Sequence, residues 1–254
     1  MKVSILQRDI VWAKPEENVK RANQVFDRLP KSDLYVLPEM FSTGFATQPE
    51  GIAESANSDT LQWMKQKAAQ FDAAIVGSIA VKDGDQYFNR MYFVEPDGNV
   101  TIYNKRHLFT YGGEDRHFTS GDGRVIVSFR GIRFMLEVCY DLRFPVWSRN
   151  RGDFDAIIYV ASWPVSRVKA WSSLLVARAI ENQCFVIGVN RVGKDPNCEY
   201  NGASVILDPY GEVLASCPLG QETETSVEMN MELLEQFRQK FPVLNDADSF
   251  DIKN

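Results

Sequence analysis

The chain has 254 residues, 44% of them hydrophobic, and carries 28 basic against 34 acidic side chains, a net charge of −6. This acidic balance, with no long basic run, argues against nucleic acid and against an anionic membrane as partners. An α/β chain of this length buries a sizeable core and often forms one domain, so we expect a single domain over residues 1–254.

The amino-terminal residues and the cysteines indicate the cellular compartment of the protein. Its first apolar run, residues 3–7, is too short for a signal peptide or a membrane span and is followed at once by charged residues. We therefore expect a cytoplasmic protein, and free thiols for its four cysteines, which form no C-x-x-C pair. With only two histidines and no HExxH motif, we expect no metal site.

Strand and helix patterns alternate along the first third of the chain. Proline opens the first helix, where its missing N–H costs nothing, and a second proline stops the second strand. The expected elements are a strand at 3–7, a helix at 15–29, a strand at 33–40, a helix at 60–71 and a strand at 73–81.

Hairpins interrupt this alternation in the rest of the chain, because strand-like runs flank turn sequences such as Pro96-Asp97-Gly98. The expected elements are hairpins at 86–105, 125–139 and 202–216, strands at 156–161 and 184–190, and a helix at 168–182. Near-continuous apolar runs mixed with hairpins predict an α/β fold, a four-layer α-β-β-α sandwich with two mixed β-sheets.

The segment RFMLEVCYDLRFPVW places Cys139 where a predicted strand ends, which is where α/β proteins hold reactive groups. A thiol nucleophile needs a base and donors that stabilise an oxyanion. His107 or His117 could be the base, as in a Cys-His hydrolase of another class, but a buried carboxylate can do the same. Glu39 and Lys105 also follow apolar runs, so three reactive groups occupy similar positions.

Three stretches, LPEMFSTGF, YNKRHLF and CYDLRFPVW, resemble in sequence and order the signature motifs of the nitrilase superfamily of carbon–nitrogen hydrolases. Its ω-amidase branch is the most similar, also in the tail FPVLNDADSF. The resemblance implies a Glu-Lys-Cys triad at Glu39, Lys105 and Cys139. GGEDRHFTSG resembles the family segment that bears a second active-site glutamate, which maps onto Glu114.

The resemblance also implies roles for these residues. Cys139 attacks an amide carbon, Glu39 takes the thiol proton, and Lys105 and the backbone N–H of Tyr140 hold the oxyanion. Glu114 orients the substrate or Lys105. No cofactor is required by this chemistry.

An ω-amidase hydrolyses a small dicarboxylic monoamide such as 2-oxoglutaramate. Arg167 is our candidate for binding the free carboxylate, because guanidinium binds carboxylate bidentately. Phe45 and Trp163 are candidates for apolar walls, although a surface arginine and core aromatics are equally compatible with these positions. The resemblance further implies a homodimer.

Other functions remain open at this stage. A nitrilase, an N-carbamoyl hydrolase or an aliphatic amidase of the same superfamily would share the three motifs. A non-catalytic protein that binds small molecules on the same scaffold would leave Cys139 inert. The panel of compounds from which ammonia is released separates these possibilities.

Several polar residues near the motifs have structural interpretations. Asp141 and Arg143 are expected to form structural hydrogen bonds or an ion pair in the loop after Cys139. Glu181 and Asn182 are expected to be structural residues at the end of the helix at 168–182.

Glu137 departs from the expected pattern, because a small or apolar residue is expected two positions before the nucleophile. On the same strand face, its carboxylate would raise the pKa of the Cys139 thiol by repulsion. We expect it instead to point toward solvent or to pair with an arginine such as Arg133.

Overall fold

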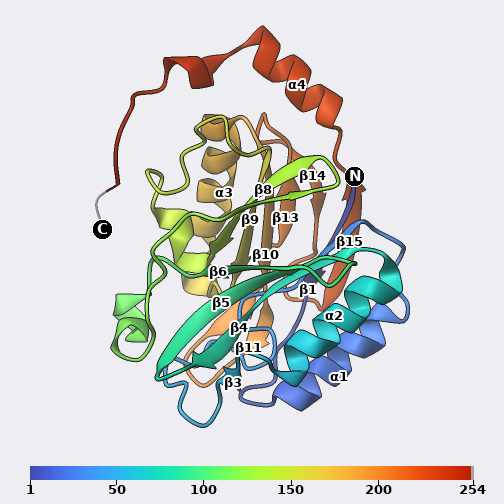
Figure 1. Ribbon diagram of the computed structural model, residues 1–254, viewed down its shortest axis with the longest axis vertical. Coiled ribbons are helices and arrows are strands. Elements are labelled where there is room, and N and C mark those ends of the chain that lie inside the picture. Colours follow the sequence, from blue (N-terminus) through green and yellow to red (C-terminus); the bar gives the residue numbers. More distant parts are fainter. Residues whose placement is uncertain (253–254) are drawn as a thin grey trace.

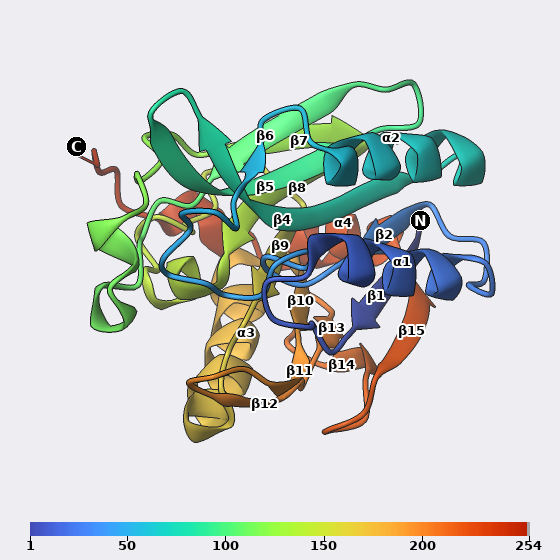
Figure 2. The ribbon, with the colours of Figure 1, turned by 90° about the horizontal axis from the view of Figure 1, so that it is seen from below.

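The computed structural model describes residues 1–252, which form two large mixed β-sheets packed face to face with helices outside (Figures 1 and 2). The first sheet has the order β15-β1-β2-β4-β5-β6, with β3 beside β4. Its strands are β1 (Lys2–Gln7), β2 (Leu34–Val36), β3 (Glu54–Ser55), β4 (Ala74–Asp83), β5 (Gln86–Val94), β6 (Val100–Asn104) and β15 (Thr223–Glu228).

The second sheet has the order β14-β13-β10-β9-β8-β7, and its three central strands are parallel. Its strands are β7 (Ile126–Phe129), β8 (Ile132–Val138), β9 (Ala156–Ala161), β10 (Phe185–Asn190), β13 (Val205–Leu207) and β14 (Val213–Ser216). A separate antiparallel ribbon consists of β11 (Val192–Lys194) and β12 (Glu199–Asn201).

Helices cover the outer faces of both sheets, which confirms the predicted four-layer sandwich. Helices α1 (Pro15–Phe26) and α2 (Asp59–Phe71) lie against the first sheet, and α3 (Val168–Asn182) lies against the second (Figure 2). Helix α4 (Met231–Lys240) follows β15 near the carboxyl terminus. In the described part of the chain, no helix is both long and apolar enough to cross a membrane.

Local sequence explains where the helices begin and end. Helix α1 starts at Pro15 as predicted but stops before Leu29, because Pro30 disfavours helical backbone in the residue before it. Helix α2 starts at Ser58, whose hydroxyl accepts a hydrogen bond from the N–H of Leu61 at 3.2 Å. The bounds of α3 agree with the prediction.

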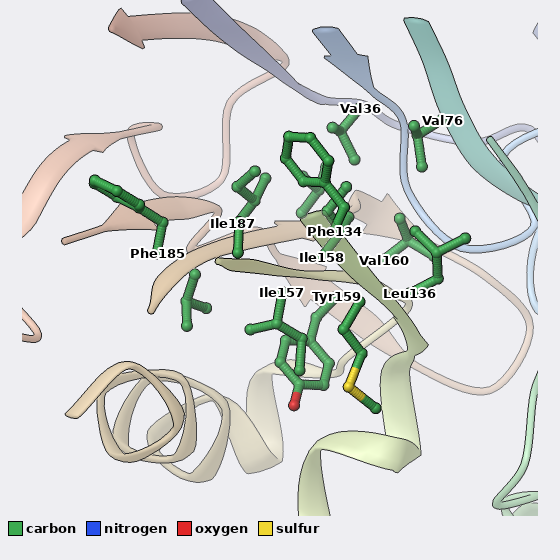
Figure 3. Close-up of a cluster of buried hydrophobic side chains, with 14 of the residues drawn as sticks. Val36, Val76, Phe134, Leu136, Ile157, Ile158, Tyr159, Val160, Phe185 and Ile187 are labelled. Atoms are coloured by element: carbon green, nitrogen blue, oxygen red, sulfur yellow. The ribbon is translucent and has the colours of Figure 1, made fainter. Parts of the chain in front are cut away.

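The core lies between the two sheets. Figure 3 shows Phe134, Leu136, Ile158 and Val160 of the second sheet pointing toward Val36 and Val76 of the first. Ile157 and Tyr159 point the other way, toward α3. This alternation fixes which residues of β8 and β9 meet the other sheet and which meet the helix.

Two differences from the prediction concern the first sheet. Strand β2 ends at Val36, not beyond Pro38, because the chain turns there and Met40 adopts a left-handed conformation with φ 45°. Strand β15 was not predicted. It pairs antiparallel with β1, and its TETSVE sequence is polar enough to hide the strand pattern.

Candidate active site

Four chain segments that follow strands meet at one edge of the sandwich. Glu39 follows β2, Lys105 follows β6, Cys139 follows β8, and Ser162 follows β9. The side chains of Glu39 and Lys105 are fully buried, and Cys139 is partly exposed. Residues separated by up to 123 positions are thereby brought together, since the N–H of Ser162 donates to Oε2 of Glu39 at 2.7 Å.

Lys105 lies between two carboxylates. Its Nζ is 3.0 Å from Oε1 of Glu39, and 3.1 Å and 2.9 Å from the two oxygens of Glu114. The side-chain amide of Asn89 donates to both acids, at 2.7 Å to Glu39 and 3.1 Å to Glu114. One ammonium and one amide therefore fix both carboxylates in orientation.

The charges of this cluster act on one another. Burial by itself lowers the pKa of Lys105, but the carboxylates of Glu114 and Glu39 more than reverse this, and the pKa is raised. Burial raises the pKa of Glu114 as well, with Lys105 opposing and Glu39 adding to the rise. The ammonium is therefore always charged.

The thiol of Cys139 is held in its protonated form. Burial raises its pKa well above the ordinary value, the charge of Glu39 raises it further, and Lys105 and the N–H of Ser162 oppose the rise. A thiol in this state would need a base to become a nucleophile. The Glu39 carboxylate, whose charge acts on the sulfur, is the candidate.

The backbone of Cys139 is strained, with φ 48°, and it opens the short 3₁₀ helix η3 (Cys139–Arg143). Asp141 holds this turn: its carboxylate accepts hydrogen bonds from the N–H of Val138 at 3.0 Å and from the hydroxyl of Tyr103 at 2.8 Å. Non-glycine residues keep such a conformation only when the surroundings enforce it. Asp141 is structural, as predicted.

Cys139 opens into a cavity of about 680 Å³. Tyr140 lines it beside the sulfur, as do the three predicted substrate contacts, Phe45, Trp163 and Arg167. The ring of Phe45 also covers the ammonium of Lys105, 5.1 Å from its centroid. The structure thus brings Cys139, Tyr140 and the three predicted substrate contacts to one cavity, whereas Glu39, Lys105 and Glu114 are buried and do not line it.

Arg143 lies in a different place from the one predicted. It forms no ion pair with Asp141; its guanidinium lines the cavity and stacks on Trp163, 4.9 Å from the ring centroid. Arg167 stacks similarly on Phe109 at 5.2 Å. Within residues 1–252 neither guanidinium pairs with a carboxylate, so both are available to a negatively charged ligand.

The histidines do not provide the base of a Cys-His pair. Nδ1 of His107 is 2.8 Å from Asp141, and its ring stacks on Phe144. Nδ1 of His117 is 2.9 Å from Glu50. Among the residues that the structure describes, neither histidine lines the cavity at Cys139.

Comparison with known proteins decides the family. The model of the carbon–nitrogen hydrolase family matches residues 2–239. This chain belongs to the carbon–nitrogen hydrolase family. It is 45% identical to Omega-amidase YafV of Escherichia coli K12, over 98% of each protein, and 36% identical to 2-oxoglutaramate amidase of Bacillus subtilis, over 96% of each.

The fold agrees with this assignment. The solved structure of a CN-hydrolase superfamily protein from Xanthomonas campestris superposes with a TM-score of 0.97 at 38% identity, covering 100% of this chain and 99% of that one. That protein carries an arsenic adduct in its active site. The predicted family and fold are therefore confirmed, and the chain is a hydrolase.

Sequence reasoning missed three residues of the candidate site. Asn89 stands in an apolar strand, where a buried amide is unusual, and this contrast was the available signal. Ser162 contributes only its backbone N–H, and the identity of a residue gives no signal for a backbone contact. The amide of Asn190 further fixes the Trp163 backbone, accepting from its N–H at 2.7 Å and donating to its oxygen at 2.9 Å.

The expectation for Glu137 was wrong. Glu137 is fully buried, and Arg133 pairs with Asp155 instead. Its partner in register on β9 is Tyr159, which points toward α3, whereas Cys139 has already turned out of the strand. Glu137 therefore does not share the face of the nucleophile.

Other sequence expectations have these outcomes. Glu181 pairs with Arg178 at 2.8 Å, and Asn182 accepts from the N–H of Asn150 at 2.8 Å, so both are structural as predicted. The four cysteines are free thiols.

Proposed function

We propose that this hydrolase is an ω-amidase that releases ammonia from the terminal amide of a small dicarboxylic monoamide such as 2-oxoglutaramate. One observation carries the proposal: Cys139, next to the charges of Glu39 and Lys105, opens into the same cavity as two unpaired guanidiniums. The relatives named Omega-amidase and 2-oxoglutaramate amidase, at 45% and 36% identity, support it.

The first half of the reaction forms a thioester. Sγ of Cys139 attacks the amide carbon while Glu39 takes the thiol proton. The negative charge that develops on the amide oxygen is stabilised by the ammonium of Lys105 and by the backbone N–H of Tyr140. Protonated Glu39 then gives its proton to the leaving nitrogen as the carbon–nitrogen bond breaks, so that ammonia departs.

The second half reverses the roles. Glu39, again ionised, removes a proton from water as the water oxygen attacks the thioester carbon. The oxyanion is held by the same two donors, and Glu39 returns its proton to the departing sulfur. The free acid and the thiol of Cys139 result, which balances every proton without a cofactor.

Glu114 orients the cluster in this proposal. It receives two contacts from Lys105, and the N–H of Phe109 donates to its Oε2 at 2.6 Å. A carboxylate held this way keeps the ammonium aimed at the reaction centre.

The substrate carboxylate is bound by the guanidiniums of Arg167 and Arg143. Both are pinned on aromatic faces, which leaves their N–H groups free to bind carboxylate bidentately. Phe45 and Trp163 form apolar walls on either side of the acyl chain.

The decisive experiment measures ammonia release from 2-oxoglutaramate and from an amide of equal length whose carboxylate is masked as a methyl ester. We expect kcat/KM for the free acid to be about 10²-fold higher, because the methyl ester cannot form the charge-assisted bidentate hydrogen bonds that the unpaired guanidiniums of the cavity offer to a carboxylate. Equal rates would contradict carboxylate selection.

The same panel separates the other functions. Turnover of nitriles or N-carbamoyl amino acids in preference to amides would identify another branch of the superfamily. Binding without turnover, together with no alkylation of Cys139 by iodoacetamide, would identify a binding protein.

Two further properties are part of the proposal. Free thiols are suited to the cytoplasm. Ile180 on α3 and Val165 just before it are exposed apolar side chains, 51% and 41% accessible, and suit a homodimer that pairs through this helix. Sedimentation of the purified chain tests the dimer, and a monomer at micromolar concentration would contradict it.

A further inference from the structure

A buried acid lies beneath the loop that carries the nucleophile, and the proposed reaction does not use it. Glu137 is the second-to-last residue of β8. Its side chain faces α3 and is inaccessible to solvent. Its Oε2 is 2.9 Å from the hydroxyl of Ser148. Its Oε1 has no hydrogen-bond partner within residues 1–252.

The arrangement of hydroxyls around Glu137 favours a protonated acid. Tyr159 donates to Oγ of Ser148 at 3.0 Å, and that same Oγ lies 3.3 Å from the backbone oxygen of Phe144. A serine hydroxyl has one proton to donate and two lone pairs to accept with. If Glu137 carries a proton, it and Tyr159 both donate to Ser148, and Ser148 donates to Phe144, so every proton has an acceptor.

An ionised Glu137 would fit less well. The single proton of Ser148 would then be drawn to the carboxylate, and the bond to Phe144 would be lost. A charged oxygen, Oε1, would remain buried without a donor, which is far more costly than a buried neutral carbonyl oxygen. Arg178, whose charge opposes the rise in the pKa of Glu137, is already paired with Glu181 at 2.8 Å.

The hydrogen bond between Glu137 and Ser148 joins the two ends of the loop formed by residues 138–147. The loop includes Cys139, Tyr140 and Arg143, which all line the cavity. From α3, Arg178 reaches into the same loop and donates to the backbone oxygen of Leu142 at 2.5 Å. The strained conformation of Cys139 is thus held from below as well as by Asp141.

We propose that Glu137 is a positioning residue that works as a neutral acid: its proton bonds Ser148 and so clamps the base of the loop that bears Cys139. The inference rests on the proposed function only in taking Cys139 as the nucleophile. Glu137 acts through the loop and does not touch the reacting atoms.

The charged and titratable groups around Glu137 come from every neighbouring element. They are Asp141 in η3, Tyr159 in β9, Tyr103 in β6, Arg178 and Glu181 in α3, and Cys184 after it. Burial, and then the charge of Asp141, raise the pKa of Glu137 well above its ordinary value. This direction agrees with the hydrogen-bond geometry.

The first test compares substitutions that keep or remove the donor. Glu137→Gln retains an N–H donor of similar shape, whereas Glu137→Leu, Ser148→Ala and Tyr159→Phe each break the network. The rate of alkylation of Cys139 by iodoacetamide, followed by mass spectrometry of its peptide, reports nucleophile placement whatever the true substrate is. We expect the alkylation rate of Glu137→Gln to stay within about threefold of wild type, and the rates of Glu137→Leu and Ser148→Ala to fall about tenfold. In the ammonia-release assay, kcat of these two variants should fall while KM stays unchanged.

Matched controls separate placement from stability. Ser4 and Tyr35 are buried, and their hydroxyls bond Ser32 and Pro30 at 2.8 Å, remote from the nucleophile loop. Ser4→Ala and Tyr35→Phe should lower the melting temperature without slowing alkylation. If Glu137→Gln is as slow as Glu137→Leu, an ionised acid is needed and the proposal is wrong. If Tyr159→Phe and Ser148→Ala destabilise the fold but alkylate normally, the clamp is only structural.

A second test reads the proton directly. As pH rises above 4.5, the ordinary value, an unfolded Glu137 releases its proton while the folded protein keeps it, so wild type loses stability that Glu137→Gln retains. The ratio of their unfolding equilibrium constants should change by up to about tenfold per pH unit between pH 5 and 8. Parallel pH profiles would show that Glu137 is ionised and would overturn the proposal.

Discussion

The amino ends of β8 and β9 carry Arg133, the second residue of β8, and Asp155, which precedes β9; at their carboxyl ends the same two strands lead into Cys139 and Ser162. Both ends are polar. At the amino end Oδ1 of Asp155 accepts from Arg133 at 2.7 Å and from Arg238 of α4 at 2.9 Å. In Figure 1, α4 lies at the top of the molecule.

The two ends differ in how completely their charges are matched. Burial by itself raises the pKa of Asp155, but Arg133 and Arg238 outweigh it and the pKa is lowered. At the carboxyl end one ammonium serves two carboxylates, a thiol is kept protonated, and the guanidiniums of Arg143 and Arg167 face an open cavity. The paired charges at the amino end stabilise the fold, whereas the unpaired guanidiniums at the carboxyl end can bind an anionic ligand.

Removing the nucleophile should have the largest effect of any change at either end. Cys139→Ala should lose at least about 10⁴-fold in kcat, because the thioester cannot form. Ammonia release in single-turnover and steady-state assays measures this. A folded Cys139→Ala protein that keeps measurable turnover would refute the proposed mechanism.

Lys105→Ala should reduce kcat by about 10²–10³, roughly 3–4 kcal/mol of transition-state stabilisation, because an oxyanion donor is lost. The variant also leaves Glu39 and Glu114 buried without their common cation, so its melting temperature should fall. Lys105→Met, a neutral residue of similar length, provides the control for packing. If kcat of either variant equals that of wild type, the ammonium does not act on the oxyanion.

Changes in the guanidiniums should act on binding. Arg143→Leu and Arg167→Leu should each raise KM for a carboxylate substrate by about 10- to 100-fold with little change in kcat, since the lost contact serves ground state and transition state alike. KM for the methyl ester should not change. An effect in only one variant would assign the carboxylate to that arginine alone.

At the amino end, Asp155→Asn should cost about 2 kcal/mol in the free energy of unfolding, because hydrogen bonds to charged groups are weakened. Activity per folded molecule should be unaffected. Because the pKa of Asp155 is lowered in the folded state, its contribution is complete above 3.8 and disappears as pH falls through the folded value. Urea unfolding of wild type and variant should therefore converge at low pH, and a constant difference would contradict this.

Many of the strands and helices could be predicted from short stretches of sequence. Strand β9 and helix α3 have the predicted bounds, because an unbroken apolar run and a helical period depend only on neighbouring residues. The three motifs also lie at predictable places, at the ends of apolar runs. Strand β15 could not be predicted in this way, since edge positions tolerate polar residues. Helix α4 was also not predicted, although Asn230 caps it and Leu234 buries its apolar face.

Local sequence patterns were enough to find the candidate reactive groups of this hydrolase and to place each of them after a strand. Their neighbours depend on how distant segments pack. Asp141 and Arg143 are two positions apart, yet one is buried under the turn and the other faces the cavity, because the left-handed Cys139 redirects the chain. Asn89 and Glu137 acquire their roles from strands distant in sequence, since burial and hydrogen-bond partners arise only when those strands pack together.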